Sequence, residues 1–99
     1  MKKNEKWPFE DPPNFIVLTT TDVAFEGSDI LYVYHNSDDG IWQFHSHLNP
    51  SANEAVVAGL KEIYDIDNSI SEIANLPLGY FAYRHSKEEN WIIEKDEEE

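Results

Sequence analysis

The sequence predicts an α+β domain in which a mostly antiparallel sheet of about five strands carries two helices packed on one of its faces. Residues 30–46 have the pattern of a β-hairpin, because two runs rich in β-branched and aromatic residues flank the turn formers at 36–40. Two Ser-x-x-Glu capping signals, starting at Ser51 and Ser69, each precede apolar residues at helical spacing. Two further strand-like runs follow the helical region, which is the segregated order of an α+β fold.

The length and composition of the chain limit the classes of protein to which it can belong. The chain has 99 residues, of which 40% are hydrophobic, so it is long enough for one domain with its own core. It contains no cysteine, which excludes disulfides, thiolate metal sites and cysteine nucleophiles. No apolar run approaches the ~20 residues that a membrane helix requires, and the N-terminal residues lack the apolar stretch of a secretory signal. We therefore expect a soluble, cytoplasmic protein.

The net charge is −13, from 20 acidic and 7 basic residues. Such a surface repels the phosphates of nucleic acids and of anionic membranes, so we expect neither as a partner. It attracts basic proteins and speeds their association at low salt. The alternative interpretation is that the acidic surface serves only to keep the protein in solution.

The chain divides into an N-terminal arm (1–14), a single domain (15–94) and an acidic tail (95–99). Three prolines exclude regular structure from the arm. Trp7 and Phe9 are nevertheless too apolar to be left in water, so we expect the arm to pack back onto the domain. The tail, KDEEE, consists of charged residues alone, and its composition predicts no ordered structure.

The first predicted strand is 15–20, and its nearly continuous apolar run favours a central place in the sheet. The hairpin follows, with Gly40 supplying the positive φ that closes its turn. Since strand side chains alternate between faces, we expect one aromatic face that anchors the core, formed by Tyr32, Tyr34, Trp42 and Phe44. The opposite face then carries Leu31, Val33, His35, Ile41, Gln43 and His45.

A helix is predicted to begin at Ser51 and to end in the polar run 65–68. Its apolar stripe would be Val56, Val57, Leu60, Ile63 and Tyr64. Gly59 within it costs ~1 kcal/mol relative to alanine, which suggests close packing against another element. A short second helix starts at Ser69 with Glu72 as its capping partner, directs Ile70 and Ile73 inward, and ends before Pro77. The last strands are 80–85 and 91–94.

Three strings carry a family resemblance: WPFEDPPN, ILYVYHNSDDGIWQF and NSISEIANLPLGYFAYR, the last followed by a late tryptophan. They resemble a family of short bacterial domains of unknown function, which is similar to a group assigned on genomic context to immunity proteins of polymorphic toxin systems. The positions that match are Gly40, Trp42, Leu76, Pro77, Gly79, Tyr80, Ala82, Arg84 and Trp91. Two positions depart from the pattern, because Ile41 separates the glycine from its tryptophan and Tyr80 replaces an expected tryptophan. The resemblance implies a binding role and no catalytic residues.

Histidines and acids offer candidate chemical sites. His35, His45 and His47 could together bind zinc or copper, although histidines at a strand edge are more often solvated or hydrogen-bonded. Asp38 and Asp39 could hold calcium or act as an acid pair, but the EF-hand spacing fails and a turn role fits them better. The chain contains no G-x-S-x-G, no H-E-x-x-H and no glycine-rich phosphate loop, so no motif supports catalysis.

The single arginine, Arg84, and the tryptophans are candidates for recognition. Arg84 could clamp a carboxylate or phosphate, or it could pair with an acid or lie against Trp91 within the fold. Tryptophan and tyrosine dominate binding interfaces, but they also fill small cores.

We expect a protein-binding domain of the immunity or inhibitor type, acting on a basic partner without a cofactor and without enzymatic activity. Its expected contact residues are Asp38, Asp39, Trp42, Arg84 and Trp91. The first alternative is a small hydrolase or metal-dependent enzyme that uses His35, His45 and His47. The second is a structural or regulatory domain.

Overall fold

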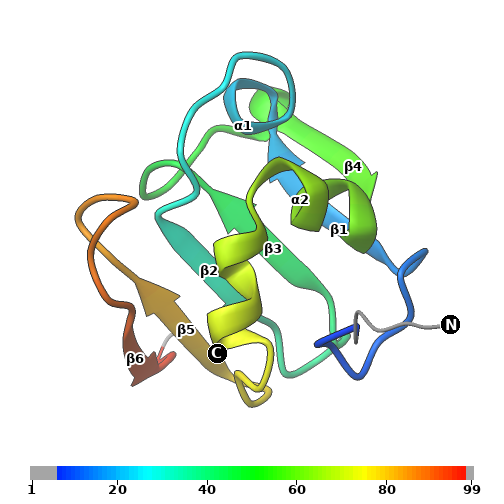
Figure 1. Cartoon of the computed structure of the whole chain (residues 1–99), viewed down its shortest axis with the longest axis vertical. Coiled ribbons are helices and arrows are strands. Elements are labelled where there is room, and N and C mark those ends of the chain that lie inside the picture. The colour runs from blue at the N-terminus through cyan, green and yellow to red at the C-terminus, as the bar shows by residue number, and fades with distance from the viewer. Residues whose placement is uncertain (1–6, 98–99) are drawn as a thin grey trace, which may run out of the picture.

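Six strands form one mixed sheet in the computed structural model, which describes residues 7–97 (Figure 1). The strands are β1 (Ile16–Thr20), β2 (Tyr32–His35), β3 (Trp42–His45), β4 (Ala55–Gly59), β5 (Tyr80–Tyr83) and β6 (Ile92–Lys95). The helices are α1 (Thr21–Phe25) and α2 (Leu60–Ile66), with 3-10 helices η1 (Ala52–Glu54) and η2 (Asn68–Ile73). The strand order is β4-β1-β3-β2-β5-β6, in which β1 and β3 are parallel and all other neighbours antiparallel. The α+β class is confirmed, and β1 lies inside the sheet, second from one edge. The sheet has six strands instead of about five, and the described residues contain more helical segments than the two expected.

The additional strand is β4, and it corrects the prediction of a helix from Ser51. Residues 55–59 pair antiparallel with β1, from Thr20 opposite Ala55 to Ile16 opposite Gly59. Valines pack well on an extended edge, and pairing with the central strand outweighs their helical spacing. The helix begins only at Leu60, where the Glu62 side chain accepts a hydrogen bond from the Gly59 N–H (2.8 Å). The close packing predicted at Gly59 is wrong, since an added Cβ would lie 3.8 Å from its nearest neighbour.

The hairpin is present, but its two strands do not share the predicted aromatic face. His35 lies opposite Trp42 and Tyr34 opposite Gln43, so the tryptophan is on the opposite face from Tyr34. The reason is the length of the turn. The Asn36 N–H donates to the Ile41 carbonyl (3.0 Å), which leaves the four residues 37–40 as the loop. An even loop length pairs odd-numbered positions with even-numbered ones, and a change of one residue exchanges the faces.

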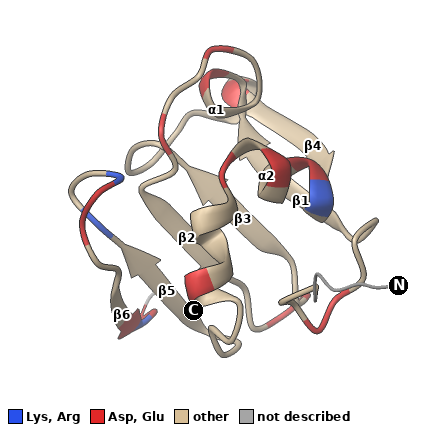
Figure 2. Ribbon diagram, in the orientation of Figure 1, with Lys and Arg blue, Asp and Glu red and all other residues tan. Residues whose placement is uncertain are grey.

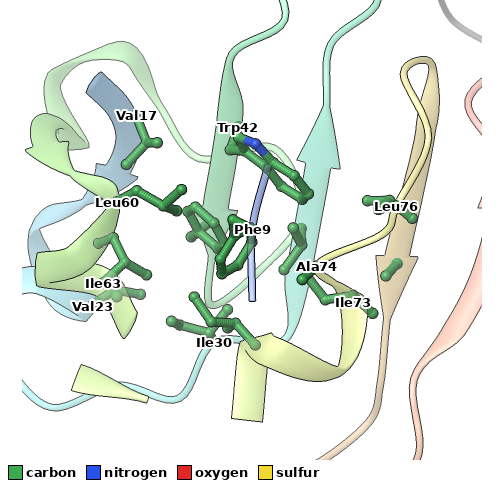
Figure 3. Packing of buried hydrophobic residues seen from close by; sticks show 14 residues of the cluster. Phe9, Val17, Val23, Ile30, Trp42, Leu60, Ile63, Ile73, Ala74 and Leu76 are labelled. Carbon is green, nitrogen blue, oxygen red and sulfur yellow. The ribbon is translucent and has the colours of Figure 1, made fainter. Parts of the chain in front are cut away.

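The helices, the arm and one face of the sheet enclose the hydrophobic core. Helices α2 and η2 lie in front of the sheet in Figure 1, on the side that carries Trp42 and Phe44. Phe9 from the arm enters the centre of this core, between Leu60 on one side and Ala74 on the other (Figure 3). The arm's packing is thereby confirmed for residues 7–14, while residues 1–6 lie outside the described part.

Helix η2 follows α2 directly and is capped differently from the prediction. The Asp67 carboxylate, rather than a Ser69–Glu72 box, accepts the hydrogen bond from the Ser69 N–H (3.0 Å). Ile70 and Ile73 point inward, as predicted.

The C-terminal strand continues further than expected. Strand β6 includes Lys95, and the N–H of Asp96 donates to the Gly79 carbonyl (2.8 Å). Glu98 and Glu99 of the predicted tail lie outside the described residues. Among residues 7–97, no helix has the length and apolar character needed to cross a membrane.

Candidate functional site

The second face of the sheet is lined with aromatic side chains. Because Tyr34 pairs with Phe81 and Tyr32 with Tyr83, four rings from β2 and β5 lie on the face opposite Trp42. The Tyr34 and Phe81 rings stack at 5.3 Å, and Tyr32 stacks on Tyr83 at 6.4 Å. Each of the four is only partly buried. We define the open face by its register positions: Leu18, Tyr32, Tyr34, Gln43, His45, Val57, Phe81, Tyr83, Ile92 and Glu94.

Two adjoining hollows lie on the open face. The first, with a volume of about 750 Å³, has Leu18, Gln43 and His45 among its lining residues and is bordered by residues 48–52. The second, of about 470 Å³, extends over β2, β5 and β6. They share three lining residues, Tyr34, Leu48 and Asp96, so they lie side by side, and we refer to the two together as the groove.

The border of this groove is acidic. Glu94, Asp96 and Glu97 line the second hollow, and Asp96 also reaches the first. Lys95 lies between them in sequence and also lines the second hollow, while its Nζ is 5.6 Å from the ring of Tyr80 on the opposite face. Three carboxylates therefore face one ammonium at this border. Acidic residues also predominate around the rest of the domain (Figure 2). The groove therefore combines aromatic surface with negative charge.

His45 is a deeply buried titratable side chain of the open face. It is 7% exposed, and its Nδ1 has no hydrogen-bond partner in the part of the chain that the structure describes. The pKa of His45 is lowered to about 4, chiefly by burial and also by the nearby His47, while Asp22 acts in the opposite direction. The imidazole is consequently neutral at pH 7 and offers a nitrogen lone pair beside Tyr34, whose ring is 5.6 Å away.

A chain of polar contacts runs from α1 to η1 beside this histidine. The Ser46 hydroxyl donates to Asp22, and His47 Nδ1 lies 3.0 Å from the same hydroxyl oxygen. His47 Nε2 is 3.4 Å from Glu54. Burial raises the pKa of Asp22, but hydrogen bonds led by that from Ser46 outweigh it and lower the value to about 2. Since Ser46 gives its proton to Asp22, His47 is not placed to activate it as a nucleophile.

The three histidines of the metal hypothesis are not brought together. His35 lies on the core side of the sheet, where its ring stacks on Trp42 at 3.9 Å and its Nδ1 is 2.7 Å from the Leu76 carbonyl. His45 lies on the open face, and His47 is exposed in the following loop. Residues 7–97 contain no group of three or more histidines and acids close enough to hold a metal ion.

Of the expected contact residues, the two aspartates are exposed at the hairpin turn. Asp39 accepts a hydrogen bond from the Ile41 N–H (2.9 Å), which is the turn role weighed against calcium binding. Trp42 is 2% exposed and donates from its Nε1 to Asp11 of the arm (3.0 Å). Its ring is part of the core, so it is not available for contact with another protein.

Arg84 is likewise 2% exposed. Its Nη2 lies 3.0 Å from Asp67 Oδ2, and its Nε and Nη2 both donate to the Ile30 carbonyl, at 3.1 and 3.0 Å. The guanidinium also lies 4.0 Å from the ring centre of the half-buried Trp91. Both structural alternatives, an acid pair and a tryptophan contact, are therefore present at once.

The aromatic residues of the open face were missed from the sequence as a site. The sequence pattern assigns Tyr32 and Tyr34 to the core, and it does not distinguish Phe81 and Tyr83 as recognition residues. The signal that could have revealed them is the number of residues in the hairpin loop. With a four-residue loop, Tyr34 and Trp42 lie on opposite faces of the sheet. No family model, curated protein or solved structure matches the chain.

Proposed function

We propose that this protein is a protein-binding domain whose open face docks onto a basic partner. The observation that carries the proposal is the groove over β2, β3 and β5, where stacked aromatic rings lie beside Glu94, Asp96 and Glu97. Tyrosines supply large contact area with a polar end and are enriched at the energetic centres of interfaces. Partly exposed aromatic rings on an uncovered sheet face are typical of a surface that is completed by another molecule.

The charge selects the chemistry of the partner. A net charge of −13 opposes binding to nucleic acids and to anionic membranes, and it favours a protein with a basic surface. A sheet face of this kind can present ~800 Å² to one partner, which is the size of a standard interface. The acidic border would then accelerate docking, while the aromatic rings would slow dissociation.

An immunity-type role is the specific form of this proposal. The family resemblance implies a small inhibitor, and an acidic inhibitor can cover a basic active site or substrate cleft of a toxin. Binding would take place in the cytoplasm, where the toxin would otherwise act on its own producer. The enzyme alternative has less support among the described residues, because His35 lies on the opposite face of the sheet from His45 and the Ser46 hydroxyl donates to Asp22.

The first experiment is a capture from lysate of the source cells at low and high salt, followed by reconstitution with the purified captured protein. Two double variants make the same change in net charge: Glu94→Lys with Glu97→Lys beside the groove, and Glu88→Lys with Glu89→Lys in the β5–β6 loop. All four positions are exposed. We expect a stoichiometric complex that the first variant weakens about ten-fold or more and the second about two-fold.

Two outcomes would overturn the proposal. Equal losses from both variants would mean that the captured protein recognises net charge rather than the open face. A large loss only from charge reversal at Asp38 and Asp39 would place the interface at the hairpin turn instead.

A further inference from the structure

The first hollow of the open face has a composition that suits one kind of side chain. Its lining residues include the aromatic Tyr34, the amide-bearing Asn36, Gln43 and Asn49, and the apolar Leu18 and Leu48. Among residues 7–97, Asp96 is its one charged lining residue, and no lysine or arginine of that range lines it. A site with an aromatic face, several neutral oxygen acceptors and a single negative charge is complementary to a planar cation with many donors.

His45 supplies an independent observation at the same place. It is more than nine-tenths buried, it lines the hollow, and its Nδ1 lacks a partner among the described residues. A buried nitrogen without a hydrogen bond is costly, and a bound donor would remove that cost. The ring is neutral at pH 7 and therefore does not repel a cation.

We propose that this hollow is the receiving pocket for an arginine side chain of the basic partner, with the guanidinium held between the Tyr34 ring and Asp96. The inference rests on the proposed function and specifies its point of contact. Arginine is favoured over lysine because a planar guanidinium stacks on a ring and distributes five N–H donors among separate acceptors, whereas an ammonium is a compact, strongly hydrated charge. A volume of about 750 Å³ is within the range of pockets that take small molecules, so it has room for an arginine side chain.

The negative charge in this pocket is already felt by Tyr34. Burial raises the pKa of the Tyr34 hydroxyl, and the charge of Asp96 raises it further. The two residues also line the same hollow, which lets one bound cation interact with both groups. The pocket opens into the second hollow through Tyr34, Leu48 and Asp96, so a chain lying along the aromatic rings could direct one side chain inward.

The test uses the full chain and three pentapeptides, blocked at both ends, that differ only at a central arginine, lysine or citrulline. Citrulline keeps the planar shape but is uncharged. Binding is followed by NMR chemical shifts. We expect the arginine peptide to shift the signals of Tyr34, Gln43 and His45, and to bind about ten-fold more tightly than the citrulline peptide and about three-fold more tightly than the lysine peptide.

Matched variants separate the pocket from general charge. Asp96→Asn and Glu88→Gln remove the same charge, one at the pocket and one in the β5–β6 loop. We expect the first to weaken the arginine peptide about five-fold and the second to leave it unchanged. Gln43→Met replaces the side-chain amide of a lining residue by an apolar group of similar size, without a charge change. It should also reduce binding, because one acceptor for the guanidinium is lost, and it keeps the test valid if Asp96→Asn disturbs the fold.

Equal affinity for the arginine and citrulline peptides, or equal effects of the two charge variants, would overturn the inference. The proposed function has a separate outcome, because the captured partner can be tested on the same variants. A partner that binds through the open face while arginine peptides do not bind would refute the pocket alone. If arginine peptides shift these signals but no protein is captured through the open face, the result supports the pocket and refutes the broader proposal.

Discussion

Arg84 joins three segments that are distant in sequence. Its guanidinium contacts Asp67 at the start of η2, the Ile30 carbonyl before β2, and the ring of Trp91 before β6. A lysine cannot reproduce this arrangement, because it has no planar fork of donors. Sequence reasoning identified the two possible partner types but not Asp67 itself, since any of 20 acids could have been the partner.

We predict that Arg84→Met lowers the free energy of unfolding by about 3 kcal/mol or more, because it leaves the Asp67 carboxylate buried without its partner. Urea denaturation at pH 7 measures this loss. Adding Asp67→Asn to Arg84→Met should recover part of it, since the buried charge is then removed. A loss below about 1 kcal/mol for Arg84→Met would show that the buried pair does not hold these segments together.

His45 makes stability depend on pH. Its folded pKa is about 4, below the ordinary 6.5, so between these values the unfolded chain binds a proton that the folded chain does not. The free energy of unfolding should therefore fall by up to about 3 kcal/mol as the pH is lowered from 6.5 to 4. A further loss should follow from 3.8 towards 2, where the hydrogen-bonded Asp22 carboxylate becomes protonated.

Urea denaturation from pH 7 to pH 4 tests this dependence, with His45→Gln as the variant. The glutamine does not titrate, so most of the slope between pH 6.5 and 4 should disappear. The exposed His85→Gln is the control and should keep the slope. An unchanged slope in His45→Gln would exclude His45 as its source.

At the scale of elements, sequence patterns predict the helices and strands whose formation depends on neighbouring residues in the chain. Strand β1 and the hairpin were predicted because apolar runs and turn formers are local signals. The helix predicted from Ser51 failed because residues 55–59 fit either state locally, and only pairing with β1 selects the strand. The predicted face of Tyr34 is wrong for a related reason. A change of one residue in the length of the turn decides whether Tyr34 faces the core or the solvent.

The late start of α2 has a testable consequence at its N-terminus. The Glu62 carboxylate accepts the Gly59 N–H at 2.8 Å, so Glu62→Ala should destabilise the protein by about 1 kcal/mol. Thermal or urea denaturation measures the change. Glu72→Ala, at an exposed acid of η2, is the matched control and should change stability by less than about 0.5 kcal/mol. If both alanines have the same effect, the contact does not define the start of the helix.

At the scale of the whole molecule, the sheet divides the protein into two functional sides. One face is buried under α2, η2 and the arm, and it contains Trp42 and Arg84 in structural roles. The other face carries the groove and its acidic border. This division explains why two of the expected contact residues, Trp42 and Arg84, are buried in the core. Residue type suggests a binding role, but it does not show on which face of the sheet a side chain lies.

The two components of the open face should control different steps of binding. Acids beside the groove act over a distance and steer the encounter, so association with the basic partner should slow about ten-fold or more between 20 mM and 300 mM salt. Stopped-flow or surface-based kinetics measures both rate constants. Glu94→Lys with Glu97→Lys should lower the association rate, whereas Phe81→Ala should raise the dissociation rate and leave association nearly unchanged. Dissociation that depends on salt as steeply as association would contradict this division. Contacts between aromatic rings are insensitive to the screening of charges by salt. Such a salt dependence would therefore mean that charge, and not the aromatic rings, holds the complex together.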